Sequence, residues 1–158
     1  MACENLGTGT RLILTIGTGT RSKQDFISLL KSNDVSAIVD VRRFPTSRFA
    51  HFKGAEFEKM LEENGIGYVY MGDKLGGYRK GGYEAYMESE DFKQGIAEVE
   101  KLASASRVAI VCAEKFPWRC HRRFIATYLE KLGWKVIHII DEERCWIPKE
   151  SVVRSSGW

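Results

Sequence analysis

The stretch RVAIVCAEKFPWRCHRR, residues 107–123, indicates the fold class of this chain. It opens with a short apolar run, 107–113, whose β-branched residues predict a buried strand. Pro117 follows at a position that the first turn of a helix tolerates, and Gly133 provides a helix stop. The stretch therefore predicts a strand that leads into a helix running from Pro117 to Gly133, which is the repeating unit of an α/β protein.

The same alternation continues along the rest of the chain. Four more apolar runs predict strands at 11–17, 35–41, 66–72 and 135–141. Helical periodicity predicts a helix after the first strand, with Ser22 as its N-cap, and further helices at about 55–64 and 89–103. Strands that are apolar throughout predict an α/β fold with a mostly parallel five-stranded sheet and helices on both faces.

Length and composition favour one domain. The chain has 158 residues, of which 44% are hydrophobic and 28% charged, so it is long enough for a substantial core and too apolar for a disordered protein. We expect an N-terminal extension at 1–10, the α/β domain at 11–141 and a C-terminal tail at 142–158 that packs on the domain.

The cysteines and the termini favour a soluble cytoplasmic protein with reduced thiols. The four cysteines show neither the density of a secreted disulfide framework nor the paired spacing of a zinc site. The first residues lack the apolar stretch of a secretory signal, and no run is long enough to span a membrane. We therefore expect no membrane partner, no metal and no cofactor.

Basic and aromatic residues gather in three windows that follow predicted strands. The windows 41–55, 74–83 and 115–129 contain no acid, yet they hold nearly half of the 24 Lys and Arg and half of the aromatic residues. Because parallel strands end at one edge of the sheet, the fold predicts a basic crevice with aromatic walls there. Such a groove suits a phosphate-bearing polymer, and the partner that we expect is DNA, single-stranded or carrying a lesion.

Three charged residues near strand ends are candidate catalytic groups. Asp40 and Glu114 lie at or near the carboxyl ends of predicted strands and are flanked by basic groups. A carboxylate that faces a basic crevice can activate water or stabilise a developing positive charge, or it can form an ion pair that orients an arginine. Lys115 is a candidate amine nucleophile or phosphate contact.

Cys120 has two competing interpretations. It lies near a predicted helix start, beside His121 and several arginines, which lower a thiol pKa and favour the nucleophilic thiolate. Alternatively it packs inward along the helix, and the sequence favours this second interpretation. Cys112 ends a predicted strand and is expected in the core. Neighbouring Cys120 and His121 on one helix would point about 100° apart, which disfavours a shared metal ion.

Several motifs together resemble a known family, the domain of unknown function DUF488. They are TIGTGTRS (15–22), DVRRFPTSRF (40–49), LGG (75–77) and CAEKFPWRCHRR (112–123), and the likeness extends from Leu12 to Asp141. The family usually has His-Ser where this chain has Thr18 and Gly19. The positions that match its motifs are Gly17, Asp40, Arg42, Pro45, Cys112, Glu114, Pro117, Cys120, His121 and Arg122. The resemblance also implies an association with DNA base repair, as in archaeal relatives.

These observations lead to one hypothesis and two alternatives. The first is a DNA glycosylase that turns out a damaged base, with Asp40 or Glu114 as the catalytic carboxylate. The nucleic-acid contacts expected for it are Arg42, Arg43, Phe44, Arg48, Tyr78, Arg79, Trp118, Cys120, His121, Arg122 and Arg123. One alternative is a sulfur- or phosphoryl-transfer enzyme that uses Cys120 as a thiolate, and the other is a module that binds nucleic acid or a nucleotide without catalysis.

Overall fold

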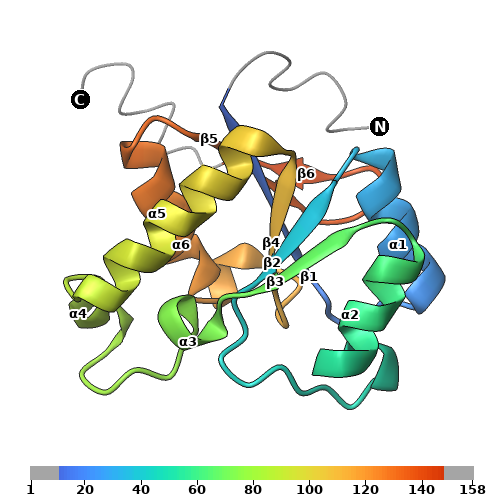
Figure 1. The fold of residues 1–158 in the computed structure, drawn as a ribbon, viewed down its shortest axis with the longest axis horizontal. Coiled ribbons are helices and arrows are strands. Elements are labelled where there is room, and N and C mark those ends of the chain that lie inside the picture. Colours follow the sequence, from blue (N-terminus) through green and yellow to red (C-terminus); the bar gives the residue numbers. More distant parts are fainter. Residues whose placement is uncertain (1–10, 148–158) are drawn as a thin grey trace.

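The strands form one sheet in the computed structural model, which describes residues 11–147 (Figure 1). The sheet order is β3-β2-β4-β1-β5-β6, and all neighbours are parallel except β6, which runs antiparallel to β5. The strands are β1 (Leu12–Gly17), β2 (Ala37–Asp40), β3 (Gly67–Tyr70), β4 (Val108–Cys112), β5 (Lys135–Ile139) and β6 (Cys145–Trp146).

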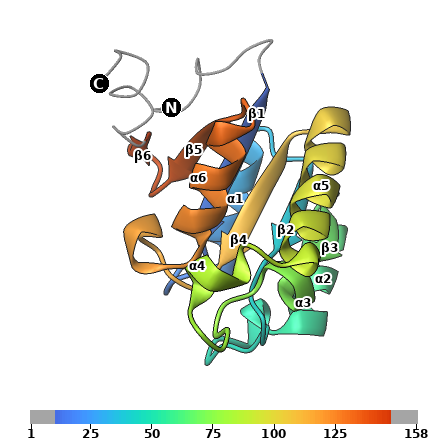
Figure 2. The same cartoon turned by 90° about the vertical axis from the view of Figure 1, so that its left-hand side faces the viewer.

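Helices cover both faces of this sheet, as Figure 2 shows. On one face α1 (Lys23–Ser32) and α2 (Gly54–Glu63) bury Phe26 and Phe57 against β1, β2 and β4. On the other face α5 (Glu90–Ala105) and α6 (Arg122–Lys131) bury Phe92 and Ile125. The shorter elements are α3 (Gly72–Leu75), α4 (Tyr83–Tyr86) and the 3-10 turns η1 (Ala50–Phe52) and η2 (Pro117–Arg119).

The α/β fold, the parallel sheet and the five expected strands are confirmed. The sequence did not predict β6, a two-residue strand that pairs with the end of β5 and so brings residues 145–146 onto the domain. The predicted N-terminal extension and the tail from 148 onward lie outside the described residues. Within the described part of the chain, no helix is long and apolar enough to cross a membrane.

The helix expected from Pro117 is interrupted. Pro117 starts only the 3-10 turn η2, and the backbone is extended at Cys120, with φ −140° and ψ 153°, before α6 begins at Arg122. At this break the Arg122 side chain turns back along the chain and donates hydrogen bonds to the carbonyls of Glu114 and Lys115. As a result Cys120 precedes the helix instead of lying within it.

The loops after β1 and β4 are in close contact at the carboxyl edge of the sheet. The Thr18 amide donates to the Cys112 carbonyl at 2.9 Å. A Cβ added to Gly17 would lie 1.9 Å from the Glu114 carbonyl oxygen. Only glycine permits this approach, so the end of β1 helps to fix the backbone that follows Cys112.

Candidate functional site

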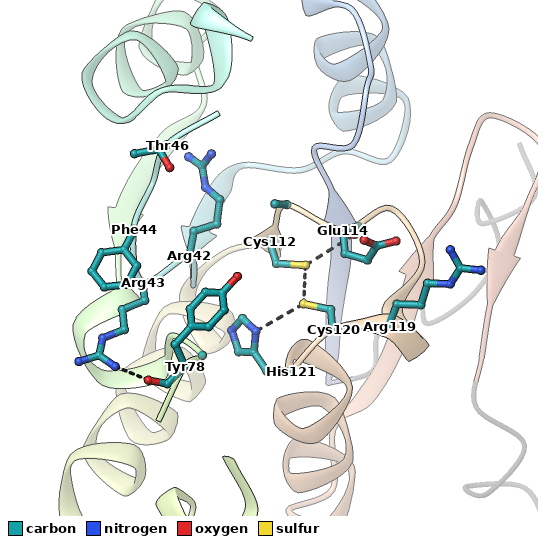
Figure 3. Close-up of a pocket in the computed structure, with 12 residues that line it drawn as sticks. Arg42, Arg43, Phe44, Thr46, Tyr78, Cys112, Glu114, Arg119, Cys120 and His121 are labelled. Carbon is teal, nitrogen blue, oxygen red and sulfur yellow. Dashed lines mark hydrogen bonds between the residues drawn. The ribbon is translucent and has the colours of Figure 1, made fainter. Parts of the chain in front are cut away.

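A cavity of about 700 Å³ opens at the carboxyl edge of the sheet (Figure 3). Its walls come from the segment after β2, the loop between α3 and α4, the end of β4 and the break before α6. These segments belong to the three basic and aromatic windows of the sequence or directly adjoin them. The lining residues are Arg42, Arg43, Phe44, Thr46, Gly77, Tyr78, Cys112, Ala113, Glu114, Arg119, Cys120 and His121.

Cys120 presents its sulfur to this cavity among three potential hydrogen-bonding groups. Its Sγ lies 2.8 Å from Cys112 Sγ, 3.4 Å from His121 Nδ1 and 3.5 Å from the Arg122 backbone nitrogen. These interactions lower the pKa of Cys120 to about 4, chiefly through the hydrogen bond with Cys112, although burial opposes the shift. The α6 N-terminus adds its partial positive charge. This shift favours the thiolate form of Cys120 at neutral pH, as in other proteins that activate a cysteine at a helix N-terminus.

Cys112 is the protonated partner of this thiolate. It is 1% exposed at the end of β4, and burial together with the hydrogen bond to Cys120 raises its pKa. The opposite pKa shifts of the two thiols favour a state in which Cys112 keeps its proton and Cys120 loses its own. The site thus brings a thiol with a lowered pKa into contact with a thiol whose pKa is raised.

His121 is held in one orientation. Its Nε2 lies 3.1 Å from the Val41 carbonyl oxygen, which can only accept, so Nε2 bears a proton. Its ring packs 5.2 Å from the Tyr83 ring, and a Cβ at Gly77 would come within 3.2 Å of Nδ1. The remaining nitrogen, Nδ1, faces Cys120.

Arg122 is a buried cation, and the structure gives it a positioning role in place of the expected nucleic-acid contact. It is fully buried, and none of the ion pairs among residues 11–147 includes it. Its guanidinium donates to the carbonyls of Glu114 and Lys115 and to Thr15 Oγ1, at 2.8–3.0 Å. It therefore fixes the loop after β4 and adds positive charge near the two thiols.

Asp40 and Arg42 form a second buried cluster, in which the Asp40 carboxylate accepts hydrogen bonds from its neighbours. This carboxylate accepts from Arg42 Nε and Nη2, both at 2.9 Å, and from the Tyr68 hydroxyl at 2.7 Å. Burial and the nearby Asp40 charge raise the Tyr68 pKa, so this hydroxyl stays protonated. Asp40 is completely buried and Arg42 nearly so. The structure thus assigns the pair an ion-pairing role, the alternative that the sequence had left open for Asp40, and Arg42 has little surface to offer a phosphate.

Glu114 is the carboxylate that faces the cavity. No hydrogen bond or ion pair joins its side chain to another residue of the described chain, and it is only partly buried. Lys115, by contrast, is not among the lining residues, and its Nζ lies 5.5 Å from the centre of the Phe116 ring. Among residues 11–147, the cavity lining therefore includes one free carboxylate and no lysine.

Exposed aromatic rings and guanidinium groups form the cavity rim. Phe44 and Tyr78 are 62% and 84% exposed, and their rings lie 6.3 Å apart at 30°. The Arg43 guanidinium sits 5.5 Å from the Phe44 ring centre and donates to the Tyr78 carbonyl at 2.6 Å. Neither Arg43 nor Arg119 forms an ion pair within residues 11–147, so both charges remain available to an anionic ligand.

Besides the buried Arg122, four of the expected nucleic-acid contacts lie outside the cavity lining. Arg79 donates to the carbonyls of residues 72, 73 and 76 and so supports the loop that bears Tyr78. Trp118 stacks on Phe116 and lines two neighbouring hollows instead. The remaining two, Arg48 and Arg123, are exposed and lie over the neighbouring Phe49 and Phe124 rings.

The sequence did not predict Cys112, Thr46 or Arg119 as site residues. Arg119 and Thr46 were inside the basic windows, but nothing in the spacing separated lining from non-lining positions. Cys112 was expected in the core, and its burial agrees with that. The missing information was its contact with Cys120, which depends on the break before α6.

One comparison with known proteins found a family whose model covers the region that forms the cavity. The family model for the domain of unknown function DUF488 matches residues 22–129, which is more than half of the chain. No curated protein and no solved structure matches the chain significantly. The matched region contains the whole cavity lining, from Arg42 to His121. The chain is a member of the DUF488 family.

Proposed function

We propose that this protein is a thiol-dependent transfer enzyme in which the Cys120 thiolate attacks an electrophilic sulfur or phosphorus atom of an anionic ligand. The observation that carries the proposal is the position of Cys120 Sγ, at the inner end of a basic cavity and surrounded by Cys112, His121 and the α6 N-terminus. A thiolate is the nucleophilic form of cysteine, and this arrangement maintains it at neutral pH.

The surrounding residues attract the ligand, stabilise the thiolate and position the loop after β4. Arg43 and Arg119 attract the negative charge of the ligand to the cavity, where the aromatic rim made by Phe44 and Tyr78 excludes water from one side. His121 stabilises the thiolate before attack when its ring is the imidazolium, because Nδ1 then carries a proton that it can donate to Cys120 Sγ. Arg122 keeps the loop after β4 in place and offsets the negative charge that burial would otherwise disfavour.

The test compares two alkylating reagents on Cys120, one neutral and one anionic. Trypsin cleavage after Arg119 and Arg122 isolates residues 120–122, so mass spectrometry follows this cysteine separately from the others. At pH 6 we expect iodoacetamide to modify Cys120 several-fold faster in the folded protein than in urea, because the unfolded thiol is largely protonated. For iodoacetate, the ratio of the folded rate to the rate in urea should be larger still, because Arg43 and Arg119 attract its carboxylate.

A matched pair of variants distinguishes the effect of a positive charge in the cavity lining from the effect of a positive charge elsewhere on the surface. Arg119→Gln, in which trypsin leaves Cys120 in residues 116–122, should reduce the ratio of the iodoacetate rate to the iodoacetamide rate. Arg123→Gln, an exposed residue outside the cavity lining, should leave this ratio unchanged. An unreactive Cys120 in the folded protein would refute the proposal.

The free carboxylate of Glu114 favours a second candidate, excision of a damaged DNA base. Glu114 shares the cavity with the stacked rings of Phe44 and Tyr78, and a volume of about 700 Å³ accommodates a base turned out of its stack. In this candidate Glu114 activates water and stabilises the oxocarbenium-like transition state. Arg43 and Arg119 hold flanking phosphates.

Oligonucleotides that carry single lesions distinguish the two candidates. Strands with uracil, hydroxyuracil, hypoxanthine or an oxidised purine are incubated with the protein and then cut with alkali at abasic sites. Base excision predicts cutting that Glu114→Gln abolishes and Cys120→Ser retains. Absence of cutting at every lesion argues against this candidate and leaves the thiolate chemistry as the function to test.

A further inference from the structure

We infer that Cys112 is a resolving thiol, so that the substrate of the site is a disulfide that carries acidic groups and the product is a Cys112–Cys120 disulfide. This inference rests on the proposed thiolate function and narrows its substrate class from sulfur or phosphorus to sulfur. The observation behind it is a second sulfur within 2.8 Å of the nucleophile.

The two thiols are placed for sequential reaction. Cys112 is 1% exposed, whereas Cys120 is only partly buried and lines the cavity. An incoming disulfide therefore meets Cys120 first. Cys112 lies behind it, attached to the end of a central strand, and a disulfide needs the sulfurs to approach to about 2.05 Å. The short remaining distance can be closed by side-chain rotation at Cys120, which sits in extended backbone between η2 and α6.

A neighbouring thiol is useful for a sulfur intermediate in particular. When a thiolate attacks a disulfide, the enzyme is left as a mixed disulfide, and attack by a second thiol releases it. A phosphorylated cysteine is instead released by water or by an acceptor hydroxyl, for which a buried thiol in contact with the nucleophile has no evident role. The position of Cys112 therefore favours sulfur exchange.

The proposed exchange balances in atoms and electrons. Cys120 thiolate attacks one sulfur of the substrate R–S–S–R, which forms a Cys120–S–S–R bond and breaks the substrate S–S bond to release R–S⁻. This leaving thiolate takes the proton of Cys112. Cys112 thiolate then attacks the Cys120 sulfur, which forms the Cys112–Cys120 bond and releases the second R–S⁻. The two cysteines lose two electrons in total, and the substrate disulfide gains them to become two thiols.

The charges at the rim indicate the kind of disulfide. Arg43 and Arg119 have no ion pairs among the described residues and both line the cavity. A small disulfide with carboxylates, such as oxidised glutathione, would be attracted, whereas the dication cystamine would be repelled.

The experiment reacts the reduced full-length protein with oxidised glutathione and with cystamine at equal concentrations. Trypsin cleavage after Arg107, Lys115, Arg119 and Arg122 places Cys112 in residues 108–115 and Cys120 in residues 120–122, so their crosslink has a unique mass. We expect this crosslink to form several-fold faster with oxidised glutathione than with cystamine, and dithiothreitol to remove it.

Variants identify the order of the two steps. Cys112→Ser should stop at a glutathione mixed disulfide on Cys120, and Cys120→Ser should leave Cys112 unmodified. If Cys120 alkylates rapidly but the unaltered protein accumulates only the mixed disulfide, the resolving role of Cys112 is wrong while the thiolate function stands. If Cys120 reacts with neither iodoacetamide nor glutathione, the thiolate function itself fails. Because the crosslink is measured in the unaltered protein, a poorly folded variant does not weaken the test.

Discussion

At the scale of single residues, three charged groups that the sequence offered for catalysis or phosphate binding are buried and bind other groups of the protein. Asp40 and Arg42 neutralise each other, and Arg122 binds two carbonyls and a hydroxyl. These residues looked like catalytic or phosphate-binding groups in the sequence because their neighbours were basic. The separation of only two positions between Asp40 and Arg42 was a signal that pointed to an ion pair. Burial, which the sequence does not report for polar residues, decided between the two roles.

Asp40→Asn should be strongly destabilising. The substitution leaves the buried Arg42 guanidinium without its counter-charge, so we expect the free energy of unfolding to fall by about 3–5 kcal/mol. Urea denaturation followed by circular dichroism measures this change. The control is Asp141→Asn, whose ion pair with Arg144 is largely exposed and should contribute about 1 kcal/mol or less. Equal losses in the two variants would contradict the account of Asp40.

At the scale of secondary-structure elements, the site depends on how the loops after β1 and β4 fit together. The sequence predicted the strands that bear these loops, because long apolar runs bounded by glycine and charged residues are a local signal. It did not predict the break at Cys120, since that break involves Arg122 reaching back to carbonyls seven and eight positions earlier. The contact between Cys112 and Cys120 follows from the break and was missed with it. Helix rules alone would have placed Cys120 within the helix.

Gly17→Ala should disturb the site as well as the fold. The new methyl group would meet the Glu114 carbonyl oxygen at 1.9 Å, so the loop after β4 must shift, at a cost of about 1–3 kcal/mol. We expect Cys120 to alkylate more slowly at pH 6 in the folded variant. Gly54→Ala is the control, because its nearest neighbour would be an ordinary 3.7 Å away. Unchanged Cys120 reactivity in Gly17→Ala would show that this loop contact does not position the thiols.

At the scale of the whole molecule, buried polar groups link the site to the pH dependence of stability. Arg122 donates to Thr15, and Thr15 hydrogen-bonds His138 Nδ1 in the centre of the sheet. Burial, together with the Arg122 charge, lowers the pKa of His138 to about 3. His138 is therefore neutral in the folded protein across the physiological range.

Stability should consequently fall as the pH drops from about 6.5 towards 3. In this window the unfolded chain protonates His138 and the folded protein does not, so acid favours unfolding by up to about 1.4 kcal/mol per pH unit. Above pH 6.5 the His138 contribution should vanish, whereas the lowered pKa of Cys120 adds a slope of the same sign up to about pH 9. Urea denaturation between pH 5 and 6.5 measures the combined slope, and His138→Gln should reduce it. A slope that is the same in both proteins would mean that His138 titrates normally when folded.

The central claim is that Cys120 is a thiolate at neutral pH because of Cys112, His121 and the α6 N-terminus, and its most direct test is the pH dependence of Cys120 alkylation. The iodoacetamide rate on residues 120–122 is measured from pH 3.5 to 9 in the reduced, folded protein, with folding checked at each pH by circular dichroism. We predict a rate that is constant from about pH 6 to 8 and falls by half near pH 4, where the thiolate gains its proton. A rate that instead rises through pH 8–9, as for an ordinary thiol, would contradict the account.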